Sequence, residues 1–181
     1  MSGFALIVTD TSPLITLARA DQLDLLLELD APSEIPDVVF FEATREGFVD
    51  GERLVGWVNR RSKAVRIAPT SRAREWLILK EAGERAKGFG DLAAIEVVNS
   101  FSTEHPTEQI MLLYEDSDLR RYQVAQAALL VTTGTLLLEL ERAGRIQSAD
   151  RVLDEATLAD ATSSNSVLNP MTNAFARCLR T

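Results

Sequence analysis

Short apolar runs alternate along the chain with longer segments in which apolar residues recur at helical spacing. Runs of four to eight apolar residues, rich in β-branched side chains and bounded by polar or turn residues, are typical of buried strands. Phe4–Thr9 and Ile110–Tyr114 fit this description, and Ala127–Val131 is a third candidate. Ala64–Ala68 alternates between apolar and polar positions like a strand and ends at Pro69. The first run, Phe4–Thr9, ends at Asp10-Thr-Ser-Pro13, which indicates the start of a helix, with Pro13 suited to the first helical position.

Helical periodicity fills most of the remaining chain. Residues 14–29 predict two short helices with a break near Ala20-Asp21. Further helices are predicted over 72–84, 92–101, 136–143 and 149–161, with a loop at 88–90 before the second and Gly144 capping the third. For Val38–Phe41, periodicity alone leaves both helix and strand open.

Strands that alternate with helices indicate βαβ units. The chain therefore predicts an α/β fold, a three-layer sandwich with a central parallel sheet and helices on both faces. With 181 residues, one domain fits the usual size range. We expect that domain over residues 1–161, followed by a linker and a C-terminal helical tail over 162–181.

The amino-acid composition limits the kinds of functional site that the protein can form. Hydrophobic residues make up 46% and charged residues 25%, as in ordinary globular proteins. A single cysteine excludes an internal disulfide framework, and a single histidine excludes zinc sites built on several His or Cys ligands. No apolar stretch predicts a membrane span, and Asp10 interrupts the first apolar run, so we expect a cytoplasmic protein without a membrane partner. Any chemistry must rest largely on carboxylates.

Charge is spread unevenly. The formal net charge is -8, but residues 45–87 hold eleven bases and six acids, a local charge of +5. Such a segment can steer an anionic ligand, and Arg60, Arg61 and Lys63 are its candidate contacts. A solvated helical face is the alternative explanation.

Four carboxylates follow predicted elements at places where they can converge. Asp10 and Asp116 follow buried strands, Glu42 follows an apolar run, and Asp91 lies at a predicted helix start. Ligands of parallel sheets bind beyond the carboxyl ends of the strands. Carboxylate oxygens suit Mg²⁺ or Mn²⁺, which can activate water and stabilise the oxygens of a phosphodiester in an in-line displacement.

Each of these residues also has a structural interpretation. Asp10, Ser12 and Asp91 are reasonable helix caps. Glu42 taken alone fits a solvated helix position, and Asp116 with Asp118 fits a capped turn. The order and spacing of the set favour a site over these separate roles.

The same segments resemble the PIN-domain family over residues 4–155. The resemblance is carried by Val8-Thr-Asp-Thr-Ser-Pro-Leu-Ile15, Pro36-Asp-Val-Val-Phe-Phe-Glu-Ala43, Gly90-Asp-Leu-Ala-Ala-Ile95, Leu112-Leu-Tyr-Glu-Asp-Ser-Asp-Leu-Arg120, Val131-Thr-Thr-Gly-Thr-Leu-Leu-Leu138 and Gly144-Arg-Ile146. The opening and the Thr-Gly-Thr-Leu segment look most like the branch that includes VapC-type toxins.

This resemblance implies a PIN-like sandwich and a divalent-metal-dependent endoribonuclease, the toxin of a toxin–antitoxin pair. The implied catalytic residues are Asp10, Glu42, Asp91 and Asp116; the implied ligands of Mg²⁺ or Mn²⁺ are Asp10, Asp91, Asp116 and Asp118. Ser12 is the implied supporting residue, and Arg60, Arg61 and Lys63 become candidate RNA contacts. The implied partners are RNA, a small antitoxin protein and further copies of the chain.

The sequence also departs from the family pattern. Related sequences often carry a second acid two places after the one matching Asp91, where this chain has Ala93. The alternative hypothesis is therefore a non-catalytic PIN-like binding or scaffold protein. A phosphoacceptor domain is a third option, which the absence of a second aspartate two positions after Asp10 disfavours.

Overall fold

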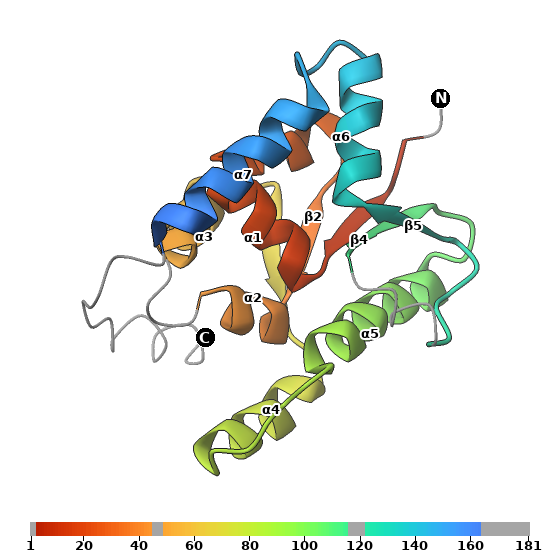
Figure 1. The fold of residues 1–181 in the computed structure, drawn as a ribbon. Coiled ribbons are helices and arrows are strands. Elements are labelled where there is room, and N and C mark those ends of the chain that lie inside the picture. Colours follow the sequence, from red (N-terminus) through yellow and green to blue (C-terminus); the bar gives the residue numbers. More distant parts are fainter. Residues whose placement is uncertain (1–2, 45–48, 116–121, 164–181) are drawn as a thin grey trace.

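The structure is a computed structural model that describes residues 3–44, 49–115 and 122–163. Strands and helices alternate along these ranges (Figure 1). In chain order the elements are β1 (Leu6–Thr9), α1 (Thr11–Arg19), the 3-10 helix η1 (Leu23–Leu29), β2 (Ser33–Pro36), α2 (Asp37–Ala43), α3 (Val49–Arg60), β3 (Val65–Ala68), α4 (Arg72–Glu81), α5 (Phe89–Glu104), β4 (Ile110–Tyr114), β5 (Ala128–Thr132), α6 (Thr133–Arg142) and α7 (Ala149–Ser163).

Five strands form one parallel sheet in the order β3-β2-β1-β4-β5. Val8 of β1 is aligned with Glu34 of β2 on one side and with Leu112 of β4 on the other. From β1 the chain first adds β2 and β3 on one side of the sheet and then β4 and β5 on the other side. The order in which strands are added therefore reverses between β1 and β4. In open α/β sheets, ligands bind beyond the carboxyl ends of the strands at such a reversal.

Helices cover both faces of the sheet, as the sequence predicts. Successive residues of a strand point to opposite faces. Ile7 accordingly belongs to the core packed by α1, α3, α6 and α7, whereas Leu6 and Val8 belong to a second core. Among the described residues, α5 is the helix that supplies buried side chains to this second core. The predicted three-layer α/β sandwich is thus confirmed.

Helix α4 extends away from the sandwich (Figure 1). Its apolar residues do not gather on one side, so it cannot bury a continuous stripe. Trp76 is its buried residue, while Ile78 is 57% exposed. We call residues 70–88, which include this helix and its flanks, the α4 arm.

Several helix boundaries differ from the predicted ones. The segment Val38–Phe41 is helical and belongs to α2, which settles the open choice. The helix expected from Leu92 begins earlier, at Phe89, because Gly88 takes the left-handed φ of 78° just before it. Pro13 is the third residue of α1, two places later than expected. Helix α3 was not predicted, although its apolar residues recur at helical spacing; Gly51 and Gly56 lower the helix propensity of its sequence.

The predicted break near Ala20-Asp21 is confirmed. Asp21 has a φ of 55°, and an aspartate tolerates this left-handed region better than most residues. Gly144, with a φ of 69°, follows α6 as expected. Within the three described ranges, no helix combines the length and apolarity that crossing a bilayer requires.

Candidate active site

Asp10 lies at the reversal point of the sheet, directly after β1. Its backbone N–H donates to the Leu113 carbonyl at 2.9 Å, which ties the end of β1 to β4. Asp10 occupies the position before α1, yet its side chain makes no capping hydrogen bond, and the residue is only 6% exposed. Asp10 therefore occupies the N-cap position of α1 but does not cap the helix through its side chain.

Glu42 reaches the same edge of the sheet from α2. Its Oε2 accepts a hydrogen bond from the Thr11 hydroxyl at 3.1 Å, and its Oε1 accepts one from the Trp76 indole N–H at 3.2 Å. Two donors from distant segments thus hold the two carboxylate oxygens. The alternative interpretation, that Glu42 is a helix residue exposed to solvent, does not fit these contacts.

Gly90 shows that these two acids converge. A Cβ atom at this position would lie 2.9 Å from Glu42 Oε2, 3.4 Å from Asp10 Oδ1 and 3.3 Å from Thr11 Oγ1. Glu42 Oε2 and Asp10 Oδ1 therefore both lie within 3.4 Å of one point. The absence of a side chain at Gly90 leaves the space in which they meet, so the structure brings Asp10 and Glu42 together.

Asp91 lies beside this space, in the first turn of α5. The helix-cap position belongs to Gly88, so Asp91 is not the cap residue. Its Oδ2 lies 4.0 Å from the point that a Cβ on Gly88 would occupy, and the Tyr122 hydroxyl lies 3.8 Å from that point. In the part of the chain that the structure describes, no three His, Cys, Asp or Glu side chains form a group that could hold a metal ion.

The end of β4 is described only as far as Glu115. Its Oε1 accepts a hydrogen bond from the backbone N–H of Thr133 at 3.0 Å, which joins the end of β4 to the start of α6. The predicted site residues Asp116 and Asp118 lie outside the described residues. Their catalytic and metal-binding roles stay predictions.

The Asp10–Glu42 pair suits a divalent cation. Mg²⁺ is commonly held by one or two carboxylates together with water and substrate phosphate. Two carboxylates against one glycine repel each other, and a cation between them relieves that repulsion. Among the described residues, no Lys, Arg or His side chain forms an ion pair with Glu42. The residues present thus fit a hard metal ion.

In the structure the hydroxyl that contacts Glu42 is that of Thr11. Ser12 is exposed, whereas Thr11 is half-buried and donates to Glu42. The predicted role of Ser12 stays a prediction. A hydroxyl directly after Asp10 was a signal that sequence reasoning overlooked. Trp76 was missed because nothing in its local sequence relates it to Glu42, 34 positions away.

The predicted RNA contacts lie away from the acids. Arg60 ends α3, and Arg61 and Lys63 precede β3, so all three are at the amino ends of the strands. Arg61 is engaged with Asp24, its Nε and Nη2 donating at 3.0 and 2.6 Å. The exposed residues Arg85 and Lys87 precede Gly88 and are nearer in the chain to the site. Their side chains form no ion pair with another described residue.

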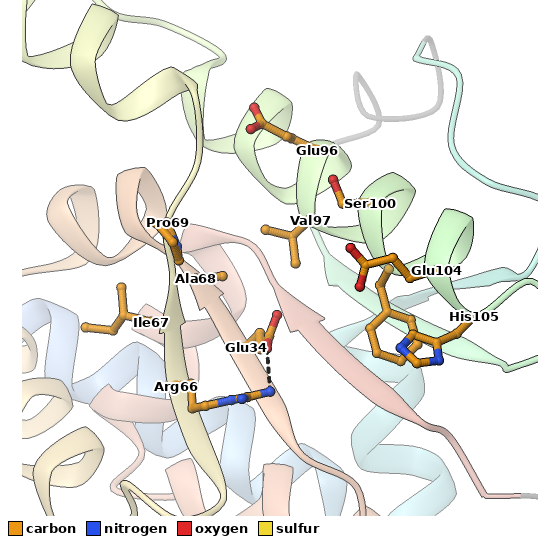
Figure 2. A pocket seen from close by; sticks show the side chains of 11 residues that line it. Glu34, Arg66, Ile67, Ala68, Pro69, Glu96, Val97, Ser100, Glu104 and His105 are labelled. Atoms are coloured by element: carbon orange, nitrogen blue, oxygen red, sulfur yellow. Dashed lines mark hydrogen bonds and ion pairs between the residues drawn. The ribbon is translucent and has the colours of Figure 1, made fainter.

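A separate pocket lies between α5 and the β2–β3 part of the sheet (Figure 2). It measures about 400 Å³ and none of the predicted site residues lines it. Two of its acids already have partners, since Glu34 binds Arg66 at 2.8 Å and Glu96 accepts from the Ser71 hydroxyl at 2.8 Å. These contacts give Glu34 and Glu96 structural roles.

Comparison with known protein families shows to which family the chain belongs. A family model described as a PIN domain matches residues 6–175, and the chain therefore belongs to the PIN-domain family. The fold is thus of the nuclease type: PIN domains are generally nucleases that bind nucleic acid and use divalent metal ions. The match extends beyond the boundary predicted at residue 161. No curated protein matches the chain.

Proposed function

We propose that the protein is a divalent-metal-dependent endoribonuclease. The observation that carries the proposal is the meeting of Asp10 and Glu42 over Gly90, at the reversal point of a parallel sheet. A structural role for either acid would not require the other beside it. Together with membership of a nuclease family, this pair favours hydrolysis of RNA phosphodiesters.

In this proposal five acids share one site. Asp10 and Glu42 provide its described part, Asp91 flanks it, and Asp116 and Asp118 are its proposed further members. The bound Mg²⁺ or Mn²⁺ supplies an activated water and charge stabilisation for the phosphodiester oxygens. Thr11 and Trp76 keep Glu42 turned toward Asp10.

The RNA surface has two candidate sets of cations. Arg60, Arg61 and Lys63 stay a proposal from the charge pattern, with Arg61 partly neutralised by Asp24. Arg85 and Lys87 form the second set, supported by their place next to Gly88. RNA that reaches Asp10 from the carboxyl edge of the sheet meets the second set first.

A toxin role belongs to the same proposal. It is supported by the resemblance of the Asp10 and Gly134 segments to the VapC-type branch. The proposal includes a small antitoxin protein, contacts between copies of the chain and action in the cytoplasm. Induced expression should arrest growth, and Asp10→Asn should relieve the arrest; arrest by both proteins would contradict a nuclease toxin.

A scaffold protein without catalysis is the second candidate. It is favoured by the finding that the described residues contain no group of three metal-ligating side chains. Calorimetric titration with Mn²⁺ separates the two candidates. Binding that is lost in Asp10→Asn supports the nuclease, and absence of binding at millimolar metal supports the scaffold.

The decisive experiment is cleavage of a mixed pool of structured RNAs. Purified protein is incubated with Mn²⁺ or Mg²⁺, with EDTA and as the variant Asp10→Asn. Asp24→Asn is the matched control, because it makes the same change in an acid that pairs with Arg61 outside the site. Metal-dependent cutting that survives in Asp24→Asn and disappears in Asp10→Asn is the expected result. Equal cutting by all proteins would defeat the proposal.

A further inference from the structure

Trp76 fixes the α4 arm to the body of the protein. The residue is 8% exposed and packs with Val38, Ala86 and Ala93. Its ring also lies against Phe41, with the ring centroids 5.7 Å apart. Trp76 is the one residue of α4 that is fully buried, and the partly buried Leu77 and Leu79 pack against the same cluster.

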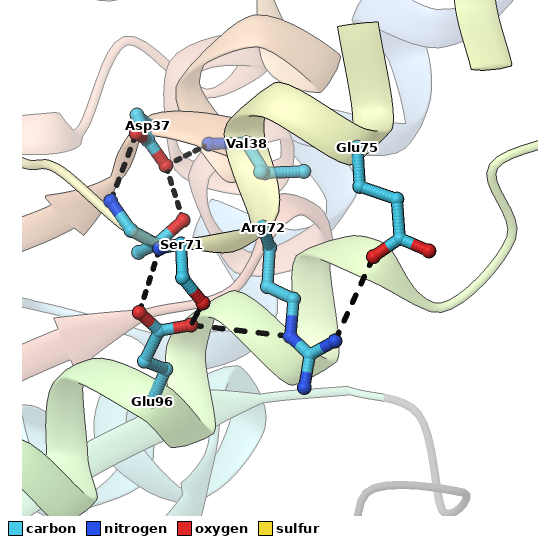
Figure 3. A network of polar contacts seen from close by, with 7 residues as sticks. Asp37, Val38, Ser71, Arg72, Glu75 and Glu96 are labelled. Atoms are coloured by element: carbon cyan, nitrogen blue, oxygen red, sulfur yellow. Dashed lines mark hydrogen bonds and ion pairs between the residues drawn. The ribbon is translucent and has the colours of Figure 1, made fainter. Parts of the chain in front are cut away.

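The flank of the arm before α4 is held by a network of polar contacts (Figure 3). The buried carboxylate of Asp37 accepts hydrogen bonds from the Thr70 N–H at 2.9 Å and the Thr70 hydroxyl at 2.6 Å. Glu96 accepts from the Ser71 N–H at 2.7 Å, and Arg72 approaches Glu96 at 3.9 Å. Anchors on α2 and α5 thus place the start of the helix that carries Trp76.

The buried indole ends in a polar contact with the candidate active site. Its Nε1–H donates to Glu42 Oε1 at 3.2 Å, while Thr11 holds Oε2 on the side of Gly90. The glutamate is therefore fixed at both oxygens. A carboxylate oxygen offers two lone pairs, so these bonds still leave acceptor capacity for a metal ion.

We propose that Trp76 is a positioning residue of the active site, which holds Glu42 so that its Oε2 stays beside Asp10. This inference rests on the proposed function, since it assumes that the two acids hold the metal. Donors that orient metal-binding carboxylates typically change metal affinity or activity by 10–100-fold when they are removed. The α4 arm thereby becomes part of the active site.

The chain offers a matched control for this role. It contains two tryptophans, and the other, Trp57, donates its Nε1–H to Asp24 Oδ1 at 2.8 Å. Trp57→Phe and Trp76→Phe therefore remove the same kind of hydrogen bond at two places. Calorimetric titration with Mn²⁺ should show a loss of affinity of about 10-fold or more in Trp76→Phe and none in Trp57→Phe.

Each variant also retains a single tryptophan, whose emission can be excited selectively. In Trp57→Phe the remaining indole contacts Glu42, and paramagnetic Mn²⁺ should quench its emission with saturation. In Trp76→Phe the emission of Trp57 should not respond. With RNA, kcat should fall in Trp76→Phe and stay near that of the unaltered protein in Trp57→Phe, since only the first variant loses a hydrogen bond to Glu42. Circular dichroism checks that both variants fold.

The outcomes separate this inference from the proposed function. If the unaltered protein binds Mn²⁺ and cuts RNA, but Trp76→Phe does both equally well, the positioning role is overturned and the nuclease stands. If the unaltered protein neither binds Mn²⁺ nor cuts RNA, both proposals fail. Should Trp76→Phe not fold, Trp57→Phe decides the matter, because absence of quenching there would overturn the placement of Trp76 beside the metal.

Discussion

Two indole–carboxylate hydrogen bonds link distant segments of this protein, and their surroundings differ. Trp57 of α3 donates to Asp24 of η1, and Trp76 of α4 donates to Glu42 of α2. The donors lie 33 and 34 positions from their acceptors, so both bonds are tertiary contacts. What separates them is the charge next to each acid.

Asp24 is balanced by a cation. Hydrogen bonding from Arg61 holds the pKa of Asp24 below its usual value, and the Trp57 hydrogen bond and the charges of Arg61 and Arg60 act in the same direction against the effect of burial. Glu42 instead faces Asp10 across Gly90, and no basic side chain among the described residues forms an ion pair with it. A balanced acid fastens two helices, whereas two acids that lie close together suit a divalent cation, which carboxylate oxygens commonly hold.

The largest expected difference between the two regions concerns activity. Glu42→Gln should lower RNA cleavage by roughly 100-fold or more, because an acid that helps hold the metal contributes several kcal/mol of charge stabilisation. Asp24→Asn should leave cleavage within about twofold. Initial rates at saturating Mn²⁺ measure both, and comparable losses in the two variants would erase the functional distinction between the acids.

The next prediction compares substitutions at two glycines that occupy the same position in their helices. Gly90 and Gly134 are each the second residue of their helix. A Cβ at Gly90 would lie 2.9 Å from Glu42 Oε2, while a Cβ at Gly134 meets nothing within 4 Å. Gly90→Ala should displace the carboxylate and reduce cleavage by about 10-fold or more, as a disturbed metal ligand does.

Gly134→Ala is the control for this change. It should keep full activity and add about 0.5–1 kcal/mol of stability, the usual gain when alanine replaces glycine in a helix. Thermal unfolding and cleavage rates are measured on both variants. Full activity in Gly90→Ala would show that the space over Gly90 is not used in catalysis.

A smaller effect concerns RNA binding at the two ends of the sheet. The double variant Arg85→Glu/Lys87→Glu should weaken RNA binding about tenfold and lower the slope of log affinity against log salt by about 2, since two phosphate contacts are lost. Arg60→Glu/Lys63→Glu removes two cations at the amino ends of the strands. Filter binding at several salt concentrations compares them; a stronger effect of the second variant would favour the RNA surface that the charge pattern predicts.

The smallest effect concerns stability and pH at Asp24. Because its pKa is lower in the folded protein, the pair with Arg61 stabilises the fold above the ordinary value of 3.8, and this contribution disappears as the pH falls through the lowered pKa. Arg61→Ala should therefore be slightly less stable than the unaltered protein at pH 7. The difference should shrink in denaturant unfolding as the pH falls below 3.8 and through the lowered pKa of Asp24; a difference independent of pH would point to lost packing.

The local sequence predicted most of the elements but not all of their ends. Apolar runs indicated the strands that became β1, β3, β4 and β5, because strand burial leaves a local pattern. The break at Asp21 was visible because the helical spacing of the apolar residues is interrupted there. Helix α3 was missed, although Leu54 and Trp57 form its buried side, because Gly51 and Gly56 lower its helix propensity. The early start of α5 depends on the left-handed conformation of Gly88, which periodicity does not encode.

The candidate site was likewise predictable from the sequence only in part. That Asp10 and Glu42 are placed to converge could be inferred from the sequence, because parallel strands bring their carboxyl ends to one edge. Only the tertiary structure determined that the two acids meet over Gly90, that Thr11 and not Ser12 contacts Glu42, and that Trp76 reaches it from an extended arm. Such partners are selected by packing between segments more than thirty positions apart, and local periodicity carries no information on that packing.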